Sequence, residues 1–252
     1  MLKNRIIPSL LLKNGRMVKS VRFERYRDVG HPITAAKIYD AQRADELIIL
    51  DITASQEKRD ILFEIVREIS AECFMPLGVG GGIRSVADIR MLLRCGADKA
   101  VINTAAVEVP GLIGEAAAAF GSSTIVVSID ARKHGSGTYE VFTHAATKAT
   151  GKDPVAWATE VVARGAGEIF LTAVDRDGTM EGLDLALIRS VADAVSVPVI
   201  ASGGVGTLED FKRGIVDGHA SAVSAASIFH FTDQSPIKTR KYLVDQGLHV
   251  RP

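Results

Sequence analysis

The second half of this chain repeats the first at a fixed offset of 122 positions. The run GGGI at 80–83 returns as SGGV at 202–205. Further pairs at the same offset are Glu46 and Glu168, Pro76 and Pro198, Asp88 and Asp210, Gly96 and Gly218, and Val101 and Val223. A repeat at a fixed period means that one structural unit is used more than once. A period of about half the chain therefore predicts a two-fold architecture with two equivalent sets of loops.

Short apolar, β-branched runs alternate with longer helical patterns along the chain. Strands are expected near 5–11, 46–51, 76–79, 99–102, 124–130, 168–174, 198–202 and 221–224. Helices are expected near 31–43, 59–72, 86–95, 111–119, 153–164, 184–195, 208–217 and 235–246. This alternation is typical of parallel strands with helical crossovers, in an open sheet or in a barrel. The repeat favours closure, and we predict one (β/α)8 TIM barrel over 1–252, with half-barrels of about 1–120 and 121–252.

The composition limits which classes of partner the protein can bind and which cellular compartment it fits. Thirty Lys and Arg balance thirty Asp and Glu, so the chain has no net charge. It therefore lacks the positive field that would attract a nucleic acid or a membrane surface. The two cysteines, Cys73 and Cys95, fit a reducing compartment. No signal peptide and no apolar run of membrane-spanning length is evident. We therefore expect a cytoplasmic protein that binds neither nucleic acid nor membrane.

Glycines also indicate local structure. Gly96, Gly165 and Gly218 each follow a helical pattern, where a helix commonly ends on a residue with positive φ. The longest segment without a regular pattern is 131–152, rich in Gly, Thr and Lys. After the fifth strand it would be a loop on the C-terminal face, where barrel active sites lie.

Glycine-rich turns follow the third and seventh expected strands, and small or hydroxyl-bearing residues follow the fourth and eighth. Glycine lets the backbone approach an anion and present N–H donors. The residues expected to bind phosphate are Gly82, Asn103, Thr104, Asp177, Gly178, Gly204, Ala226 and Ser227. The alternative is that the Gly-Gly pairs only permit tight turns, but two copies at equivalent places favour phosphate. We expect a long ligand with a phosphate at each end.

Three acids, Asp51, Asp130 and Asp175, stand at the expected carboxyl ends of strands, where core packing does not explain a charge. Asp51 is a candidate for substrate binding and Asp130 for catalysis. The alternative for each acid is to cap its following loop by accepting hydrogen bonds from local N–H groups. Lys19, in the loop after the first strand, is a candidate to contact a phosphate or polarise an intermediate, although an isolated loop lysine is more often solvated.

The first strands of the two halves align at a smaller offset of 119. IPSLL at 7–11 matches VVSID at 126–130, so that Leu11 stands where the second half has Asp130. Two facing carboxylates are suited to acid and base catalysis. This sequence offers only one of them.

Four charged residues begin four different strands: Arg5, Glu46, Lys99 and Glu168. Strand starts converge at the bottom face of a barrel, so these charges are expected to form a ring of ion pairs there, and stabilisation is the default role of that face. The six histidines show no paired metal-ligand spacing, and no nucleophile motif is evident. We expect no catalytic metal and no other cofactor.

A resemblance to one family extends over essentially the whole chain. The stretches that carry it are RIIP at 5–8, KNGRMVK at 13–19, DELIILDITAS at 45–55, VGGGI at 79–83, ADKAVINTAAVE at 97–108, SID at 128–130, GAGEIFLTAVDRDGT at 165–179, VIASGGVG at 199–206 and AASIFHF at 225–231. On these motifs the chain resembles the cyclase (synthase) subunit of imidazole glycerol phosphate synthase, the HisF family.

The resemblance implies a barrel that pairs with a glutaminase (HisH-like) subunit at its N-terminal face. In that family, ammonia from the partner travels up the barrel and attacks a ribulosyl aminoimidazole carboxamide with two phosphates. The products are imidazole glycerol phosphate, for histidine synthesis, and an aminoimidazole carboxamide ribotide. The resemblance assigns catalysis to Lys19 and Asp130, and its phosphate contacts match the residues named above. The ammonia gate that it implies consists of Arg5, Glu46, Lys99 and Glu168.

The sequence departs from the family at two places. The second catalytic aspartate of the family matches Leu11, and loss of a general acid or base typically lowers a rate by about 10²–10⁴. Ala145 and Ala146 follow Thr-His, where the family often has glycines. Leu11, the run LLLK at 10–13 and ECFMP at 72–76 resemble second-copy members that accompany another glutaminase in surface-polysaccharide clusters and supply ammonia for acetamidino sugars.

The sequence leaves three functional hypotheses open. The favoured one is a barrel with weakened or lost cyclase activity that provides ammonia for sugar amidination. The second is a working cyclase subunit of histidine biosynthesis. The third is a non-catalytic scaffold that activates its glutaminase partner, and the charged ring does not separate it from the first.

Overall fold

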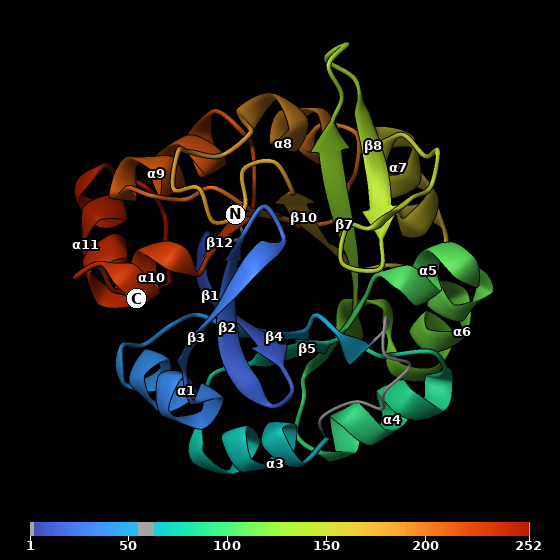
Figure 1. Cartoon of the computed structure of the whole chain (residues 1–252), viewed down its shortest axis with the longest axis horizontal. Coiled ribbons are helices and arrows are strands. Elements are labelled where there is room, and N and C mark those ends of the chain that lie inside the picture. Colours follow the sequence, from blue (N-terminus) through green and yellow to red (C-terminus); the bar gives the residue numbers. More distant parts are fainter. Residues whose placement is uncertain (1–2, 55–62, 252) are drawn as a thin grey trace.

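Eight parallel strands close into a barrel, as the repeat predicts (Figure 1). The computed structural model describes residues 3–54 and 63–251. The barrel strands are β1 (Arg5–Lys13), β4 (Leu47–Asp51), β5 (Leu77–Gly80), β6 (Lys99–Ile102), β7 (Ile125–Lys133), β10 (Glu168–Ala173), β11 (Val199–Ser202) and β12 (Ala222–Ala225). Neighbouring strands pair in the order β10-β11-β12-β1-β4-β5-β6-β7, and pairing of β7 with β10 closes the ring.

Helices surround the strands on the outside (Figure 1). They are α1 (Pro32–Ala41), α3 (Phe63–Glu72), α4 (Val86–Arg94), α6 (Gly111–Phe120), α7 (Pro154–Ala163), α8 (Leu185–Ala192), α9 (Leu208–Val216) and α11 (Pro236–Asp245), with the short α5 (Thr104–Glu108), α10 (Ser227–Phe231) and the 3-10 turn η1 (Ser122–Thr124). The expected helix near 59–72 is confirmed from 63 onward, and its beginning lies outside the described residues. No helix in the described part of the chain is long and apolar enough to cross a membrane.

Successive side chains of each strand face alternately outward and inward. The outward residues, such as Leu10 and Ile169, pack with helix residues such as Trp157 and Phe211 in the main core. The inward residues form a separate apolar layer inside the barrel, which consists of Ile7, Ile48, Val101, Val126, Phe170, Ile200 and Ala222. The alternation therefore produces two cores, one around the barrel and one within it.

The repeat is visible in helix capping. Ser85 begins α4 and Thr207 begins α9, and each hydroxyl accepts a hydrogen bond from the backbone N–H three residues later, at 3.2 and 3.3 Å. The carboxylates of Asp88 and Asp210 bond back to the two cap N–H groups, at 2.9 and 2.8 Å. This reciprocal arrangement is a capping box, and it explains why the two aspartates recur 122 residues apart.

The repeat slips by one residue after α9. Gly96 has a φ of +101° as predicted, but in the second half His219, at φ +58°, takes this conformation, and Gly218 is not among the residues with positive φ. The predicted match of Val101 with Val223 is also wrong, because Val101 faces the barrel interior and Val223 faces the helices. An extra residue in the turn thus changes the offset from 122 to 123, which exchanges the two faces of the strand.

The segment 131–152, predicted to be irregular, is largely a β-hairpin. Strand β7 continues to Lys133, and β8 (Tyr139–Thr143) returns antiparallel beside it, followed by the short β9 (Lys148–Ala149). The prediction was wrong because the Gly and Thr content was taken as loop character. Its position was correct, since the hairpin leaves the C-terminal end of β7.

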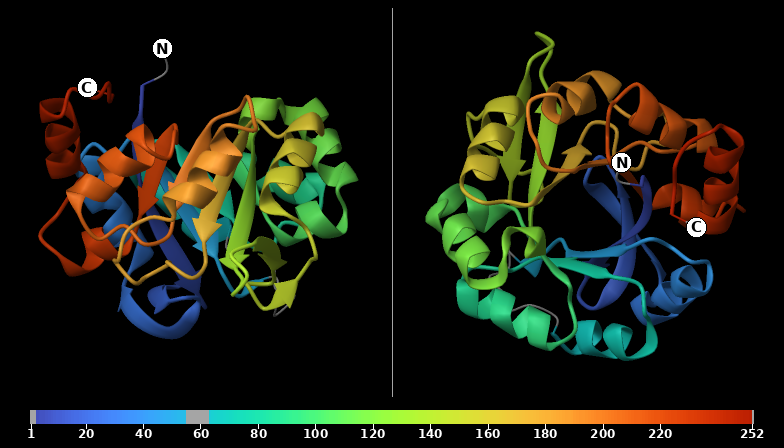
Figure 2. Two further views of the ribbon diagram at one scale, coloured as in Figure 1. Left: turned by 90° about the horizontal axis from the view of Figure 1, so that it is seen from above. Right: turned by 180° about the vertical axis from the view of Figure 1, so that it is seen from behind.

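A second hairpin, β2 (Arg16–Val21) and β3 (Glu24–Gly30), lies between β1 and α1 and was not predicted. Strand β2 also pairs antiparallel with β1, and Asn14 and Gly15, at φ +52° and +73°, form the two-residue turn between β1 and β2. Asn-Gly between two alternating runs is a strong hairpin signal, so the sequence did contain the cue. The left panel of Figure 2 shows this hairpin at the end of the barrel opposite to both chain termini.

The turn after β5 needs glycine for steric reasons, and Gly81→Ala tests this. A Cβ at Gly81 would stand 2.3 Å from the backbone oxygen of Asp51, at a φ of +105°. Gly247→Ala is the control, because Gly247 also has a positive φ, +77°, but nothing lies within 4 Å of a Cβ there. We expect the control to lose about 1 kcal/mol of stability from backbone strain and Gly81→Ala to lose at least twice as much, measured by urea denaturation. Equal losses would contradict the packing argument.

Candidate active site

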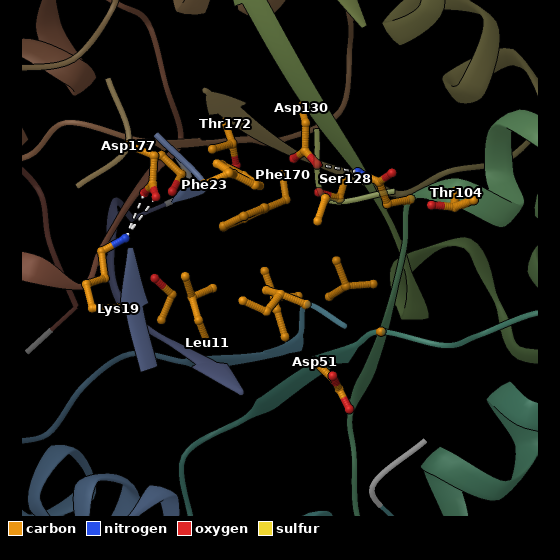
Figure 3. Close-up of a pocket in the computed structure, with 18 residues that line it drawn as sticks. Leu11, Lys19, Phe23, Asp51, Thr104, Ser128, Asp130, Phe170, Thr172 and Asp177 are labelled. Carbon is orange, nitrogen blue, oxygen red and sulfur yellow. Dashed lines mark hydrogen bonds and ion pairs between the residues drawn. The ribbon is translucent and has the colours of Figure 1, made fainter. Parts of the chain in front are cut away.

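A cavity opens at the carboxyl ends of the barrel strands, as the fold predicts (Figure 3). Its lining includes Ser9, Leu11, Lys19, Phe23, Leu50, Asp51, Asn103, Thr104, Ser128, Asp130, Phe170, Thr172, Asp177 and Ser202. A smaller, more polar pocket continues from it and is lined by Gly178, Gly204, Ser224, Ala226 and Ser227 among others. Four residues line both spaces, namely Ser9, Lys19, Asp177 and Ser202, so the two form one elongated site.

Asp130 projects inward from β7 and is buried. One of its carboxylate oxygens accepts a hydrogen bond from the side-chain amide of Asn103 at 2.9 Å. Burial raises the pKa of Asp130 to about 7, and the negative charge of Asp177 adds to this effect, while the Asn103 hydrogen bond opposes it. A carboxyl group that titrates near neutral pH is suited to general acid or base catalysis.

Leu11 lies across the cavity from Asp130, because β1 and β7 are on opposite sides of the barrel (Figure 3). The alignment of the two first strands is confirmed by the side-chain layers. Ile7 and Val126 share the inner apolar layer, and two residues further along each strand Ser9 and Ser128 line the cavity, followed by Leu11 and Asp130. Leucine therefore occupies the position that is symmetric to the carboxylate.

Lys19 lies on β2 and is buried, so it is neither in a loop nor solvated. Its ammonium group forms an ion pair with the carboxylate of Asp177, with Nζ–O distances of 2.9 and 3.0 Å (Figure 3). The pair joins the β2–β3 hairpin to the loop after β10. It places one cation in the wall that the two parts of the site share.

Asp51 and Asp175 hold local backbone. Asp51 accepts hydrogen bonds from the N–H groups of Thr53 and Ala54 at 3.1 and 3.2 Å, which is the loop-capping role considered for it, although the residue also lines the cavity. Asp175 accepts a hydrogen bond from the N–H of Lys133 at 2.6 Å and thereby ties the β7–β8 hairpin to the loop after β10. Asp130, in contrast, accepts a hydrogen bond from the side chain of Asn103, which follows the neighbouring strand β6.

The second-half phosphate residues predicted from the sequence lie together. Gly178, Gly204, Ala226 and Ser227 all line the small polar pocket, beside the Lys19–Asp177 pair. These four residues form the second-half cradle.

The first-half residues are only partly together. Asn103 and Thr104 line the large cavity, but the neighbouring glycine in its wall is Gly81, and Gly82 is not among its lining residues. The hydroxyl of Thr104 accepts a hydrogen bond from the N–H of His144 at 3.2 Å. Gly81, Asn103 and Thr104 form the first-half cradle.

The two cradles have similar backbone geometry at the starts of α5 and α10. Asn103 precedes α5 with φ −118° and ψ −87°, and Ala226 precedes α10 with φ −124° and ψ −66°. Glycines nearby are required by packing alone, since a Cβ at Gly203 or Gly204 would lie 2.6 or 2.2 Å from a backbone oxygen. The tight-turn interpretation thus accounts for the glycines, and the case for anion binding depends on the symmetric cradles themselves.

The charged residues at the strand starts form a closed ring at the opposite end of the barrel. Arg5 pairs with Glu46 at 2.9 Å and with Glu168, and Lys99 pairs with Glu46 at 2.9 Å and with Glu168 at 2.6 Å. Burial lowers the pKa of Arg5, but the carboxylates of Glu168 and Glu46 outweigh it and raise this pKa above its ordinary value. Arg5 therefore stays charged, and each carboxylate of the ring is paired with both basic side chains.

One acceptor in the ring is free. Oε1 of Glu46 is buried and has no hydrogen-bond partner within residues 3–54 and 63–251. A Cβ on Gly78 would stand 3.6 Å from this oxygen, so the oxygen faces β5 at the position where Gly78 leaves that strand without a side chain. The ring thus presents one unoccupied acceptor to the barrel interior.

Two residues that the sequence analysis did not place in the site line the cavity. One lies in the turn between β2 and β3 and the other follows β8. Phe23 lies in the turn between β2 and β3, at φ +64°, and lines the cavity (Figure 3). The N–H of Arg22 bonds the backbone oxygen of Asp177 at 2.8 Å and holds this turn over the site. Ala145 also lines the cavity, at φ +52°, and Ala146 follows at +60°. These alanines adopt the left-handed conformation that favours glycine.

The family model for histidine biosynthesis proteins matches residues 5–235. The chain belongs to the histidine biosynthesis protein family. Members of this family are generally enzymes, either isomerases or cyclases. In this family member, the described residues include no group of three or more His, Cys, Asp or Glu that could hold a metal ion.

The shifted pKa of Asp130 has a measurable effect on stability. Between its ordinary value of 3.8 and about 7, the folded protein keeps a proton on Asp130 that the unfolded chain has lost, so Asp130 lowers stability as the pH rises through this range. Asp130→Asn removes this effect. We therefore expect the variant to gain stability relative to the wild type between pH 5 and pH 8, measured by thermal denaturation at both values.

Asp28→Asn is the control for this experiment. Asp28 is exposed, and its hydrogen bond to Arg16 lowers its pKa, so it stays ionised between pH 5 and pH 8. Its stability difference from the wild type should not change over that range. A pH-independent difference for Asp130→Asn would show that Asp130 titrates normally.

Proposed function

We propose that this chain is a HisF-like synthase subunit of a glutamine amidotransferase complex, with weakened or lost cyclase activity. A glutaminase subunit docks at the N-terminal face of the barrel, and its ammonia passes through the barrel to a ligand with two phosphates. The observation that carries this proposal is Leu11 opposite Asp130, in a site that otherwise keeps the features expected of a cyclase.

The base of the barrel supports the passage of ammonia. Above the charged ring lies the inner apolar layer, which disfavours a charged ammonium ion and accepts neutral ammonia. The free Oε1 of Glu46 offers a hydrogen-bond acceptor at the entrance. The ring accordingly acts as the gate, in addition to stabilising the base.

The mouth supports a long anionic ligand. The first-half and second-half cradles have matching backbone conformations and open into one elongated site. Lys19 adds a positive charge in the wall that the two parts share. A ligand with a phosphate at each end places its middle beside Asp130, where ammonia emerges from the barrel.

Leu11 limits the chemistry at that point. Ring closure needs protons to be both accepted and donated, and the cavity offers Asp130 for this work, while the carboxylate of Asp177 is held by Lys19. Loss of one acid or base lowers the rate by about 10²–10⁴. Ammonia is then delivered to a different acceptor, and the sequence resemblance to second-copy members suggests amidination of sugars for surface polysaccharide in the cytoplasm.

A working cyclase subunit of histidine biosynthesis is the second candidate. The presence of Asp130, Lys19 and both cradles favours it. A scaffold that only activates the glutaminase is the third, and it requires the ring but not the mouth.

Leu11→Asp separates these candidates. With the ribulosyl aminoimidazole carboxamide substrate and an ammonium salt, we expect slow turnover by the wild type and a gain of about 10²–10⁴ in Leu11→Asp, because the second carboxylate is restored. Leu11→Asn, of similar size but without an acid, is the control and should show no gain. Wild-type turnover as fast as that of Leu11→Asp would identify a working cyclase, and inactivity of both would favour the scaffold.

The gate assignment is tested with Lys99→Met, in the Leu11→Asp background if the wild type is too slow. Removal of Lys99 leaves one cation for two buried carboxylates. We expect turnover with ammonium salt, which reaches the mouth from solution, to stay unchanged, and turnover with glutamine in the glutaminase complex to fall. Lys37→Met, which removes an exposed ion pair with Glu72 on the outer surface, is the control. Equal effects on both ammonia sources would disprove the gate.

A further inference from the structure

A second cavity lies on the outer side of the barrel, between α1, α10 and the β2–β3 hairpin. Figure 1 shows α1 and α10 next to each other around the barrel. None of the residues that line this outer cavity lines the mouth. Its volume is about 270 Å³, slightly below the range of about 300–1,000 Å³ that is typical of small-molecule sites, so it fits a ligand of one or two rings.

Aromatic rings from two elements line the outer cavity. Tyr39 comes from α1, and Phe229 and His230 come from α10. The ring of Tyr39 lies 6.1 Å from that of Phe229 and 6.2 Å from that of His230, measured between centroids. Met17, from β2, adds a thioether, which makes favourable contacts with rings. These side chains favour a flat aromatic ligand.

The outer cavity is also uncharged. The described residues that line it include no Lys, Arg, Asp or Glu, and its polar groups include the hydroxyl of Thr34 and the amides of Gln42 and Gln234. Burial and the nearby charge of Lys19 lower the pKa of His230 to about 4, so this ring is neutral at physiological pH. A charged ligand would lose hydration there without gaining an ion pair. Amides both donate and accept hydrogen bonds, which suits the edge of a heteroaromatic ring.

The outer cavity is in contact with two elements that hold the mouth. Met17 lies two residues before Lys19 on β2, and His230 lies on α10, which begins at Ser227 of the second-half cradle. The hydroxyl of Tyr39 and Nδ1 of His230 form a hydrogen bond of 2.9 Å, which ties α10 to α1. A ligand in this cavity would join the same three elements.

We propose that the outer cavity is a second ligand site, which takes an uncharged, flat heteroaromatic compound of one or two rings and strengthens anion binding at the mouth. The bound compound holds the hairpin and α10 against α1, in the arrangement that places Lys19 and Ser227 at the mouth. The two sites then raise each other's affinity, because coupling between sites is reciprocal. The coupling rests on the proposed binding of phosphate in the second-half cradle, whereas the outer site does not.

Three probes test the outer site on the full chain: nicotinamide, nicotinate and cyclohexanecarboxamide. Nicotinate has the ring of nicotinamide but carries a negative charge, and cyclohexanecarboxamide has the amide but no flat ring. NMR follows the backbone amides of Thr34 and Ile38, which both line the cavity. We expect nicotinamide to bind with a dissociation constant of about 1–10 mM and the other two to bind at least about tenfold more weakly.

Two variants test where nicotinamide binds. Ala35→Leu fills the cavity from α1 and should abolish binding, and Gln42→Leu removes one amide and should weaken binding about three- to tenfold. Ala41→Leu, at an exposed position of the same helix outside the cavity, is the matched control and should bind like the wild type. Thermal denaturation of each variant checks that it is folded.

The coupling is tested by titration with inorganic phosphate, with and without saturating nicotinamide. The backbone amides of Gly204 and Ala226 report on the second-half cradle. We expect nicotinamide to tighten phosphate binding at least about fivefold in the wild type and to have no effect in Ala35→Leu.

The outcomes separate this inference from the proposed function. The outer site is overturned if nicotinamide leaves the amides of Thr34 and Ile38 unshifted, binds no better than nicotinate and cyclohexanecarboxamide, or binds equally to Ala35→Leu. An unchanged phosphate affinity in the presence of nicotinamide overturns the coupling. If phosphate shifts neither Gly204 nor Ala226 while nicotinamide still binds, the phosphate site of the proposed function fails together with the coupling, and the outer site stands.

Discussion

The two-residue alternation of parallel strands determines what meets inside this barrel. On β1 the inward positions are Arg5, Ile7, Ser9 and Leu11, which contribute in turn to the charged ring, the apolar layer, the hydroxyl level and the mouth. The other barrel strands add their residues at the same levels. A shift by one residue on any strand would replace its inward set with residues that now pack against helices. Register therefore fixes the vertical order of charge, apolar surface, hydroxyl and carboxyl along the axis.

The same type of group behaves differently at the two ends of the axis. At the base, Glu46 and Glu168 are each bonded by both Arg5 and Lys99, so two basic side chains compensate two buried carboxylates. At the mouth, Asp130 has the neutral amide of Asn103 as its side-chain donor and a second carboxylate nearby, so burial raises its pKa to about 7. Buried carboxylates thus have cationic partners at the base and a neutral amide at the mouth, and it is at the mouth that burial without a cation raises a carboxyl pKa.

Most of this arrangement could be predicted from the sequence, because the repeat and the strand ends are local signals. The barrel, the ring and the facing positions of Leu11 and Asp130 follow from periodicity and alignment. The burial of Lys19 could not be predicted, since it depends on the contact between β2 and Asp177, which is 158 residues away in the chain. The position of Phe23 in the cavity could not be predicted for the same reason. The register slip was also not predicted. Gly218 matches Gly96 in the sequence, but it is His219 that adopts the positive φ of Gly96.

The slip connects the broken repeat to the chemistry of the mouth. An offset held at 122 would match Val101 with Val223 and place a valine at the inward position of both strands. The extra residue in the turn after α9 instead brings Ser224 to the inward position and leaves Val223 in the outer core. Together with Leu11 opposite Asp130, this makes the two halves of the site chemically different while their cradles stay alike. Under the proposed function, a ligand with a phosphate at each end would therefore bind in one orientation, because the part between its phosphates faces unlike walls.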